Sequence, residues 1–249
     1  MIGEKPLLKE TWNIALDIIY PRRCPICGEI LVPRNIRVHK ECKELLRYIK
    51  EPKCKKCGKL IDKEELEFCY DCVKKKFHYV KGYSLWVYDK RMQDSIAAFK
   101  YKNKKEYAVF YVEELLENYS EAIEKITPDV LIPIPLHSGK RRQRGFNQAE
   151  IIAKGIGKVL EIPVLSDLLV RKKETAPQKG LNDRERAKNL VKAFCVSNTY
   201  EKKQLHINKV ILVDDIYTTG STIEACTKVL LAYGVKEVYY ISLCIGRGY

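Results

Sequence analysis

The sequence predicts an α/β fold, a parallel sheet with flanking helices, preceded by a small metal-binding domain. From Tyr83 onward, short apolar runs typical of buried strands alternate with longer amphipathic helical patterns. Before Val73 lie seven of the ten cysteines, and their spacing repeats. We therefore expect a metal-binding domain over residues 1–80 and an α/β domain over residues 81–249.

Composition narrows the class of protein. With 249 residues, 46% hydrophobic residues and 13 glycines, the chain is typical of a globular protein. No apolar run approaches the roughly 20 residues needed to span a bilayer, and the N-terminus lacks the apolar core of a signal peptide. We expect a cytoplasmic protein that is not an integral membrane protein. The net charge of +14 favours a polyanionic partner, although solubility or a lysine-rich thermophilic composition would also explain it.

The strongest local pattern lies between Val210 and Thr222. Four apolar residues, Val210 to Val213, predict a strand buried on both faces, and two carboxylates, Asp214 and Asp215, follow at its end. Thr218, Thr219, Gly220, Ser221 and Thr222 then form a loop of small residues. A helical pattern follows and stops near Gly234.

A strand, a small-residue loop and a helix N-terminus together favour phosphate binding, because backbone N–H groups and the helix dipole face the anion. The two carboxylates would repel a phosphate and instead suit sugar hydroxyls or a divalent cation. No Gly-x-x-x-x-Gly-Lys-Ser/Thr motif occurs, so a nucleotide-triphosphate loop is a poor fit. A receiver-type acidic pocket would explain only the aspartates. The remaining alternative is a buried strand followed by a polar turn.

The early cysteines form two repeats of one ligand pattern. Each repeat has two ligands, then a gap of eleven residues, then two more ligands: Cys24, Cys27, His39 and Cys42; Cys54, Cys57, Cys69 and Cys72. This spacing is typical of zinc ribbons with structural, four-ligand sites, and we expect two structural Zn²⁺ ions. Disulfides suit a cytosolic chain poorly, and a redox pair would not explain the duplication. The spacing leaves open whether the sites are sequential or share ligands.

A region this short has little core of its own, so we expect it to depend on metal to fold. Many basic residues surround the ligands, including the run Lys74 to Lys76. These basic residues could form a surface that binds nucleic acid. Acidic residues are interspersed among them, so a solvated surface without such a partner is the alternative.

The pattern beyond residue 80 predicts the following elements in order. Strands are expected at 83–88, 130–132 and 194–196, and helices at 91–100 and 107–119. The segment Lys100 to Lys105 interleaves aromatic and basic residues, as single-strand binders do, but an exposed loop could look the same.

A basic cluster follows the strand at 130–132, where open α/β sheets place their sites. Arg141 and Arg144 are among four cations within five positions, which would neutralise a pyrophosphate or a nucleic-acid backbone. Asn147 could cap the next helix. His137 could contact a phosphate or be satisfied by its own turn. A later charged stretch, 175–190, could be a mobile lid or an ordinary surface loop.

Six motifs occur in order: the double zinc knuckle, Pro-Ile-Pro-Leu-His, Arg-Gly-Phe-Asn-Gln-Ala, Thr-x-Pro-Gln-x-Gly-Leu, Arg-x2-Asn-Leu, and Asp-Asp-x2-Thr-Thr-Gly-Ser-Thr. Together they resemble the ComF family (ComFC, GntX) over nearly the whole chain. The last motif resembles the phosphoribosyl-pyrophosphate loop of type I phosphoribosyltransferases. One departure is His39, where the family usually has a cysteine.

The resemblance implies a zinc finger joined to a phosphoribosyltransferase-like domain and a role in natural transformation. By it, Asp214, Asp215 and the loop from Thr218 to Thr222 would bind phosphoribosyl pyrophosphate with Mg²⁺. His137, Arg141, Arg144 and Arg184 would serve its pyrophosphate end.

Two function hypotheses follow from these observations. In the first, the protein handles single-stranded DNA with the DNA-uptake machinery, at the inner face of the membrane, and the pocket binds a regulatory or docking ligand. In the second, it is a phosphoribosyltransferase (a glycosyltransferase of nucleotide metabolism or salvage) with an unknown acceptor, in which Asp214 and Asp215 stabilise an oxocarbenium-like ribose. No acceptor pocket is recognisable in the sequence.

Overall fold

The computed structural model describes residues 21–172, 193–201, 203 and 205–246. Contacts divide the chain into two compact units, Met1–Leu46 and Arg47–Tyr249, and each is considered by itself. The expected division at residue 80 stays a prediction, yet the second ligand repeat lies in the same unit as the sheet. Among the described residues, no helix combines the length and apolar character that a membrane span requires.

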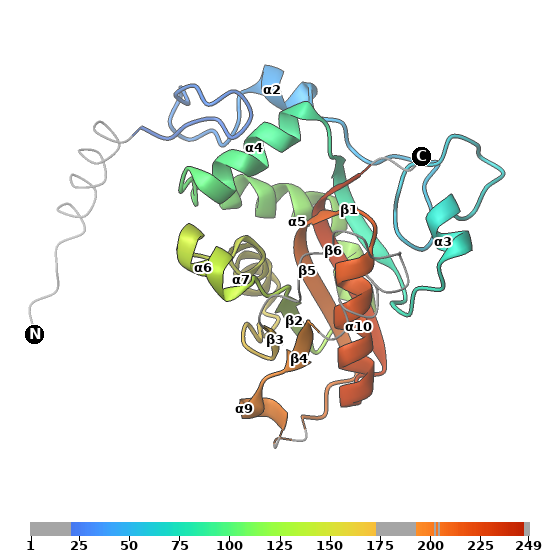
Figure 1. Ribbon diagram of the computed structural model, residues 1–249. Coiled ribbons are helices and arrows are strands. Elements are labelled where there is room, and N and C mark those ends of the chain that lie inside the picture. Colours follow the sequence, from blue (N-terminus) through green and yellow to red (C-terminus); the bar gives the residue numbers. More distant parts are fainter. Residues whose placement is uncertain (1–20, 173–192, 202, 204, 247–249) are drawn as a thin grey trace, which may run out of the picture. The chain divides into compact units, whose positions relative to one another are not determined.

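The larger unit is built on a four-stranded parallel sheet (Figure 1). Its strands are, in sheet order, β1 (Gly82–Val87), β6 (Glu237–Ile245), β5 (Lys209–Tyr217) and β2 (Val130–Pro133). All three pairings are parallel, with Leu131 opposite Ile211 and Val213 opposite Ile241. The strands expected at 83–88, 130–132 and 210–213 are confirmed. Strand β6, which pairs with two strands at the centre of the sheet, is not among the elements predicted from the sequence.

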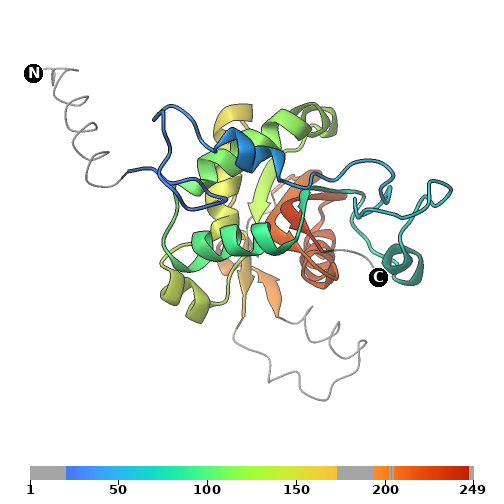
Figure 2. The ribbon, with the colours of Figure 1, turned by 90° about the horizontal axis from the view of Figure 1, so that it is seen from above.

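Helices cover both faces of this sheet (Figure 2). On one face α5 (Tyr107–Ile126) and α7 (Gln148–Leu160) contact each other and the strands, while α10 (Ser221–Tyr233) lies on the opposite face. A two-stranded antiparallel sheet, β3 (Leu169–Arg171) and β4 (Phe194–Val196), packs against α10. The other helices of the described residues are α2 (Lys40–Glu44), α3 (Tyr70–Lys74), α4 (Lys90–Tyr101), α6 (Ser138–Arg144) and α9 (Asn198–Glu201).

The helices predicted from the sequence are present, and they differ from the predictions mainly at their ends. In α4, Met92, Ile96 and Phe99 form a buried apolar face, and Asp89 caps the helix by accepting from the Met92 N–H. The helix expected at 107–119 extends to Ile126, where Thr127 ends it in the left-handed conformation. Asn147 caps α7 as expected, because its side chain accepts from the Ala149 N–H.

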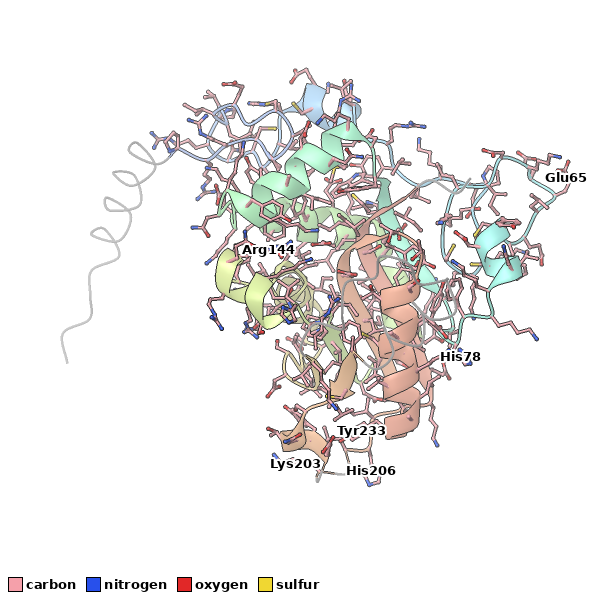
Figure 3. The ribbon with its side chains drawn as sticks, in the orientation of Figure 1. Glu65, His78, Arg144, Lys203, His206 and Tyr233 are labelled. Carbon is pink, nitrogen blue, oxygen red and sulfur yellow. The ribbon has the colours of Figure 1, made fainter. Side chains whose placement is uncertain are left out.

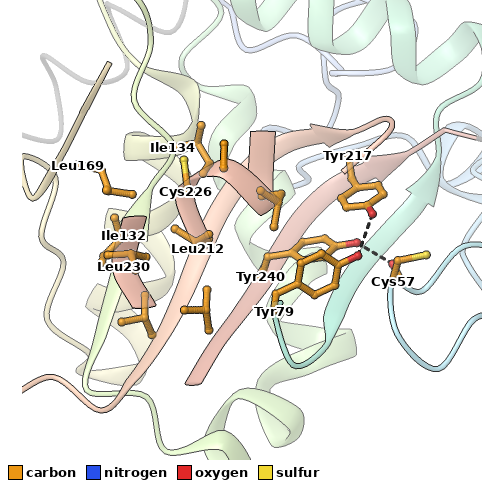
Figure 4. Packing of buried hydrophobic residues seen from close by; sticks show 14 of the residues in the cluster. Cys57, Tyr79, Ile132, Ile134, Leu169, Leu212, Tyr217, Cys226, Leu230 and Tyr240 are labelled. Carbon is orange, nitrogen blue, oxygen red and sulfur yellow. Dashed lines mark hydrogen bonds between the residues drawn. The ribbon is translucent and has the colours of Figure 1, made fainter. Parts of the chain in front are cut away.

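The core reaches the second ligand repeat through three tyrosines (Figure 4). The rings of Tyr217 and Tyr240 stack with centroids 4.8 Å apart, and Tyr79 meets Tyr240 edge-on at 5.1 Å. Tyr240 donates a hydrogen bond of 2.7 Å to the carbonyl of Cys57. The strands β5 and β6 are therefore joined to a metal-ligand turn by buried aromatic packing.

Candidate phosphoribosyl and zinc sites

The residues after Val213 place a polar loop at the carboxyl edge of the sheet. Strand β5 continues to Tyr217, so both aspartates belong to the strand, and α10 begins at Ser221. Gly220 caps α10 with φ of +76°, and a Cβ there would lie 2.2 Å from the hydroxyl of Tyr217. Only glycine therefore fits this turn. The expected strand, loop and helix order is present.

The loop offers the donors that a phosphate requires. The hydroxyls of Thr219 and Ser221 lie 2.9 Å apart, and Thr218 and Thr219 are exposed. The first N–H groups of α10 have no acceptor within the helix, since they precede its first full turn. Together these groups form a cradle (Thr218 to Thr222) that can hold a dianionic phosphate.

The two aspartates differ in their partners. Both carboxylate oxygens of Asp215 lie 2.8 Å from the amino group of Lys100, which extends from α4. Asp214 accepts from the backbone N–H of Asp215 at 2.8 Å. Burial, and then the neighbouring Asp215 charge, raise the pKa of Asp214 to about 7, against the lowering effect of that hydrogen bond and of Lys100. The pair can therefore offer ribose hydroxyls two neighbouring carboxyl groups, of which Asp214 titrates near neutrality.

The basic cluster follows β2 at the same edge of the sheet, since Pro133 pairs with Val213. His137 caps α6 by accepting from the Gly139 N–H at 3.2 Å, so its ring takes part in its own turn. Arg141 lies 3.5 Å from Glu150. Arg144, labelled in Figure 3, donates to Gln148 at 3.0 Å and to the Tyr101 hydroxyl at 2.9 Å. Arg184 and the expected lid at 175–190 lie outside the described residues.

Several contacts at this edge were not expected from the sequence. Lys100 reaches Asp215 across 115 positions, and no local pattern marks that pair. Glu224, in the first turn of α10, accepts from the backbone N–H of His78 at 2.8 Å and contacts its ring at 2.5 Å. An acid in the first turn of a helix is a visible signal, but its partner is not.

The eight predicted metal ligands gather into two sequential groups rather than interleaved ones. Cys24, Cys27, His39 and Cys42 form one; Cys54, Cys57, Cys69 and Cys72 form the other. In each group the ligand atoms all lie within 4.8 Å of one another. The same hydrogen bond occurs within each of the two turns. The N–H of the glycine after the second cysteine donates to the carbonyl of the first cysteine, at 2.9 Å in each turn.

The donor chemistry of both groups fits zinc. Four thiolates, or three with one imidazole, make a closed tetrahedral set with no position left for substrate. His39 brings its Nδ1 within 3.4 Å of the Cys27 sulfur, and its Nε2 lies 3.2 Å from the carbonyl of Ile30. That carbonyl would hold the Nε2 proton and leave Nδ1 for the metal. The histidine is therefore a compatible replacement for the usual cysteine.

Comparison with known proteins agrees with this organisation. Residues 15–73 match the double zinc ribbon domain, and residues 103–248 match the phosphoribosyl transferase domain. Competence protein F of Haemophilus influenzae is 29% identical over 230 residues, covering 87% of this chain and 93% of that protein. Competence protein ComFC of Bacillus subtilis is 26% identical over 213 residues, covering 82% of each.

Among solved structures, a purine phosphoribosyltransferase from Pyrococcus horikoshii aligns at 18% identity with a TM-score of 0.34, covering 55% of this chain and 73% of that one. The fold assignment rests on the family match, which spans more than half of the chain, and on the parallel sheet with its carboxyl-edge loop. The chain belongs to the phosphoribosyl transferase domain family and carries a double zinc ribbon ahead of that domain, the combination that the resemblance to the ComF family predicts.

Proposed function

We propose that this protein acts in DNA uptake and binds phosphoribosyl pyrophosphate at the carboxyl edge of its sheet. The main observation in favour of this ligand is the cradle around Gly220, which follows the carboxylates of Asp214 and Asp215 at the end of β5. The role in uptake is supported by relatives named Competence protein F and Competence protein ComFC. The protein would act in the cytoplasm, at the inner face of the membrane.

Each part of the ligand has a matching group. The 5′-phosphate would lie in the cradle, against the first N–H groups of α10 and the hydroxyls of Thr219 and Ser221. The ribose hydroxyls would donate to Asp214 and Asp215. Mg²⁺ would neutralise the pyrophosphate, with Arg141, Arg144 and Arg184 as the cationic side of that end and His137 as a further contact.

Single-stranded DNA is the proposed polyanionic partner. The net charge of +14 supports it, as does the half-buried Arg144, whose guanidinium lies 4.8 Å from the ring centroid of the exposed Tyr101. Binding should weaken with salt, with a log–log slope of about 0.7 per phosphate neutralised. An affinity that does not change between low and high salt would count against this partner.

Transfer of the ribosyl group to an acceptor is the second candidate function, and the family match supports it. In that reaction the C1–O bond to pyrophosphate breaks, and the bond to the acceptor forms at the same carbon. The carboxylates would hold the ribose as positive charge develops, so they would act by binding and electrostatics rather than as proton donors. The zinc groups would have a structural role in either function.

Calorimetric titration of phosphoribosyl pyrophosphate with Mg²⁺ tests the proposed ligand. We expect micromolar binding by the wild type and its loss in Asp214→Ala/Asp215→Ala. Asp94→Ala/Asp167→Ala, two exposed acids elsewhere, serves as the matched control and should bind normally. Absence of binding by a folded, zinc-loaded wild type would overturn the proposal that phosphoribosyl pyrophosphate is the ligand. Pyrophosphate release on adding candidate acceptors then separates the enzyme from the binding protein.

A further inference from the structure

The two metal-binding groups share one ligand spacing, but they differ in their exposure to solvent. In the first group one ligand is buried, one is exposed and two are half-buried: Cys24; Cys27; His39 and Cys42. In the second group three ligands are buried and one is half-buried: Cys54, Cys57 and Cys69; Cys72. The contrast is greatest at the second ligand of each repeat, because the exposed Cys27 corresponds to Cys57, which is 0% exposed. All ten cysteines lie among the described residues, and Cys27 is the only exposed one.

The sheet covers the second group. Tyr240, in β6, donates to the carbonyl of Cys57 at 2.7 Å (Figure 4). The N–H of Gly82, at the start of β1, donates to the carbonyl of Lys56 at 2.8 Å. A Cβ on Gly58 would lie only 3.3 Å from the carbonyl oxygen of Gly82. The turn that carries Cys57 is therefore packed against β1 and β6, and this packing keeps its sulfur out of solvent.

The corresponding turn of the first group has no such cover in the part of the chain that the structure describes. A Cβ on Gly28, the residue after Cys27, would meet no atom within 4 Å beyond its chain neighbours. The guanidinium of Arg23 donates to the carbonyl of Gly28 at 3.0 Å, so this turn also carries a positive charge. Reactive cysteines are typically exposed and lie in positively charged surroundings. Small oxidants can therefore reach the sulfur of Cys27, but not that of Cys57.

A second thiol with which Cys27 can react lies in the same group. The four ligand atoms of this group are all within 4.8 Å of one another, and three of them are sulfurs. Cys42 is half-buried and Cys24 is fully buried, so Cys42 is the more accessible of the two other thiols. An exposed thiolate with a second thiol close by is the arrangement that oxidises reversibly to a disulfide.

We propose that Cys27 is an oxidation site, at which a peroxide releases the metal of the first group while the second group keeps its own. The Cys27 thiolate attacks one peroxide oxygen, which gives a sulfenic acid and a hydroxide ion. The Cys42 thiolate then attacks that sulfur, forms the disulfide and displaces a second hydroxide ion. The two sulfurs thus lose two electrons, and the peroxide O–O bond takes them up. Only Cys24 and His39 remain as ligands, which is too few for a closed tetrahedral site.

The test uses the full-length, zinc-loaded protein and hydrogen peroxide as the oxidant. A colorimetric chelator measures the zinc that is released, and alkylation followed by peptide mass spectrometry identifies the thiols that have reacted. We expect the first group to release its zinc about tenfold faster than the second group, or more. Cys27 should be the first cysteine to lose its reaction with the alkylating agent, and the disulfide should join it to Cys42. A dithiol reductant and added zinc should restore the original metal content.

Two variants separate the exposure of Cys27 from other causes of zinc release. His39→Cys gives the first group four thiolates, as in the second group, and leaves Cys27 in place. We expect this variant to release its first-group zinc at close to the wild-type rate. If it instead keeps that zinc as long as the second group keeps its own, the imidazole and not Cys27 is the cause, and the proposal is overturned. Cys195→Ser removes a half-buried thiol outside both groups and should change neither rate.

The wild type alone can also contradict the proposal. Release of zinc from both groups at one rate would overturn it, as would oxidation of a second-group cysteine before Cys27. The chelator without peroxide is the remaining control, because a small unit can lose metal by opening on its own. Zinc loss that is as fast without peroxide as with it would show that opening, rather than oxidation of Cys27, releases the metal, and this result would overturn the proposal.

Discussion

The hydroxyl groups of Tyr79 and Tyr217 lie 2.9 Å apart and join the segment after the second zinc repeat to the last residue of β5. Both side chains are almost fully buried. The same segment reaches the cradle helix twice more, since Phe77 lies against Gly220 and His78 binds Glu224. The segment that follows the second repeat therefore supports the cradle directly.

Loss of metal from the second repeat should weaken ligand binding as well as stability. We expect Cys72→Ser to lower the zinc content by one ion per chain and to weaken phosphoribosyl pyrophosphate binding severalfold, because Phe77, His78 and Tyr79 follow that ligand closely. Zinc analysis and calorimetry on the same sample measure both effects. Cys42→Ser, the equivalent change in the first repeat, is the control, and an equal loss of affinity there would contradict a specific supporting role.

The hydroxyl pair itself can be tested by removing one member. Tyr79→Phe leaves the buried hydroxyl of Tyr217 without this partner, which should lower the free energy of unfolding by about 1–3 kcal/mol. Tyr79→Phe/Tyr217→Phe removes both polar groups and should recover part of that loss. Urea denaturation gives the values. Tyr83→Phe changes a half-buried ring and serves as the control, which should alter the free energy of unfolding little. A double variant that loses more free energy of unfolding than the two single variants together would contradict this account.

The pKa of Asp214 predicts how binding depends on pH. Burial and the neighbouring Asp215 charge raise this pKa to about 7, so a fraction of Asp214 is protonated at neutral pH. Ribose hydroxyls donate best to the carboxylate, and affinity for ribose 5-phosphate should therefore rise as pH increases through 7 and level off above it. Calorimetry between pH 6 and pH 8.5 measures this rise.

Asp214→Asn is the control for that pH profile. The ligand phosphate titrates in the same range, but it does so equally with both proteins. The difference between the two profiles therefore isolates Asp214. Identical profiles would show that this carboxyl does not titrate in the binding range.

The sequence predicts those parts of the site that are defined by a short run of consecutive residues. The ligand spacing of the two repeats and the stretch from Val210 to Thr222 both belong to this kind, because turn geometry and strand-to-helix connections are local. The cap at Asn147 is equally local, and its hydrogen bond to Ala149 is present.

What could not be predicted depends on contacts between distant residues. Lys100 meets Asp215, and Tyr79 meets Tyr217, only because the sheet brings their elements together. The extension of α5 to Ile126 reflects packing on β1 and α7 that a sequence window does not contain. A cavity lined by Leu66 and Val87 likewise joins two segments whose proximity no spacing encodes.

The pair of Lys100 and Asp215 allows the sharpest test of such a distant contact. Their side chains are only 15% and 12% exposed, so Lys100→Met would leave a largely buried carboxylate without its cation. We expect a loss of about 3 kcal/mol in the free energy of unfolding, at the low end of the range for broken buried pairs. Lys100→Met/Asp215→Asn should lose clearly less than the sum of the two single variants, since the uncompensated charge is gone. Lys90→Met, which removes an exposed partner of Asp94, should cost under about 0.5 kcal/mol. Additive losses in the cycle would mean that the ion pair contributes no coupling, and the charge of Asp215 would then have to be balanced by solvent.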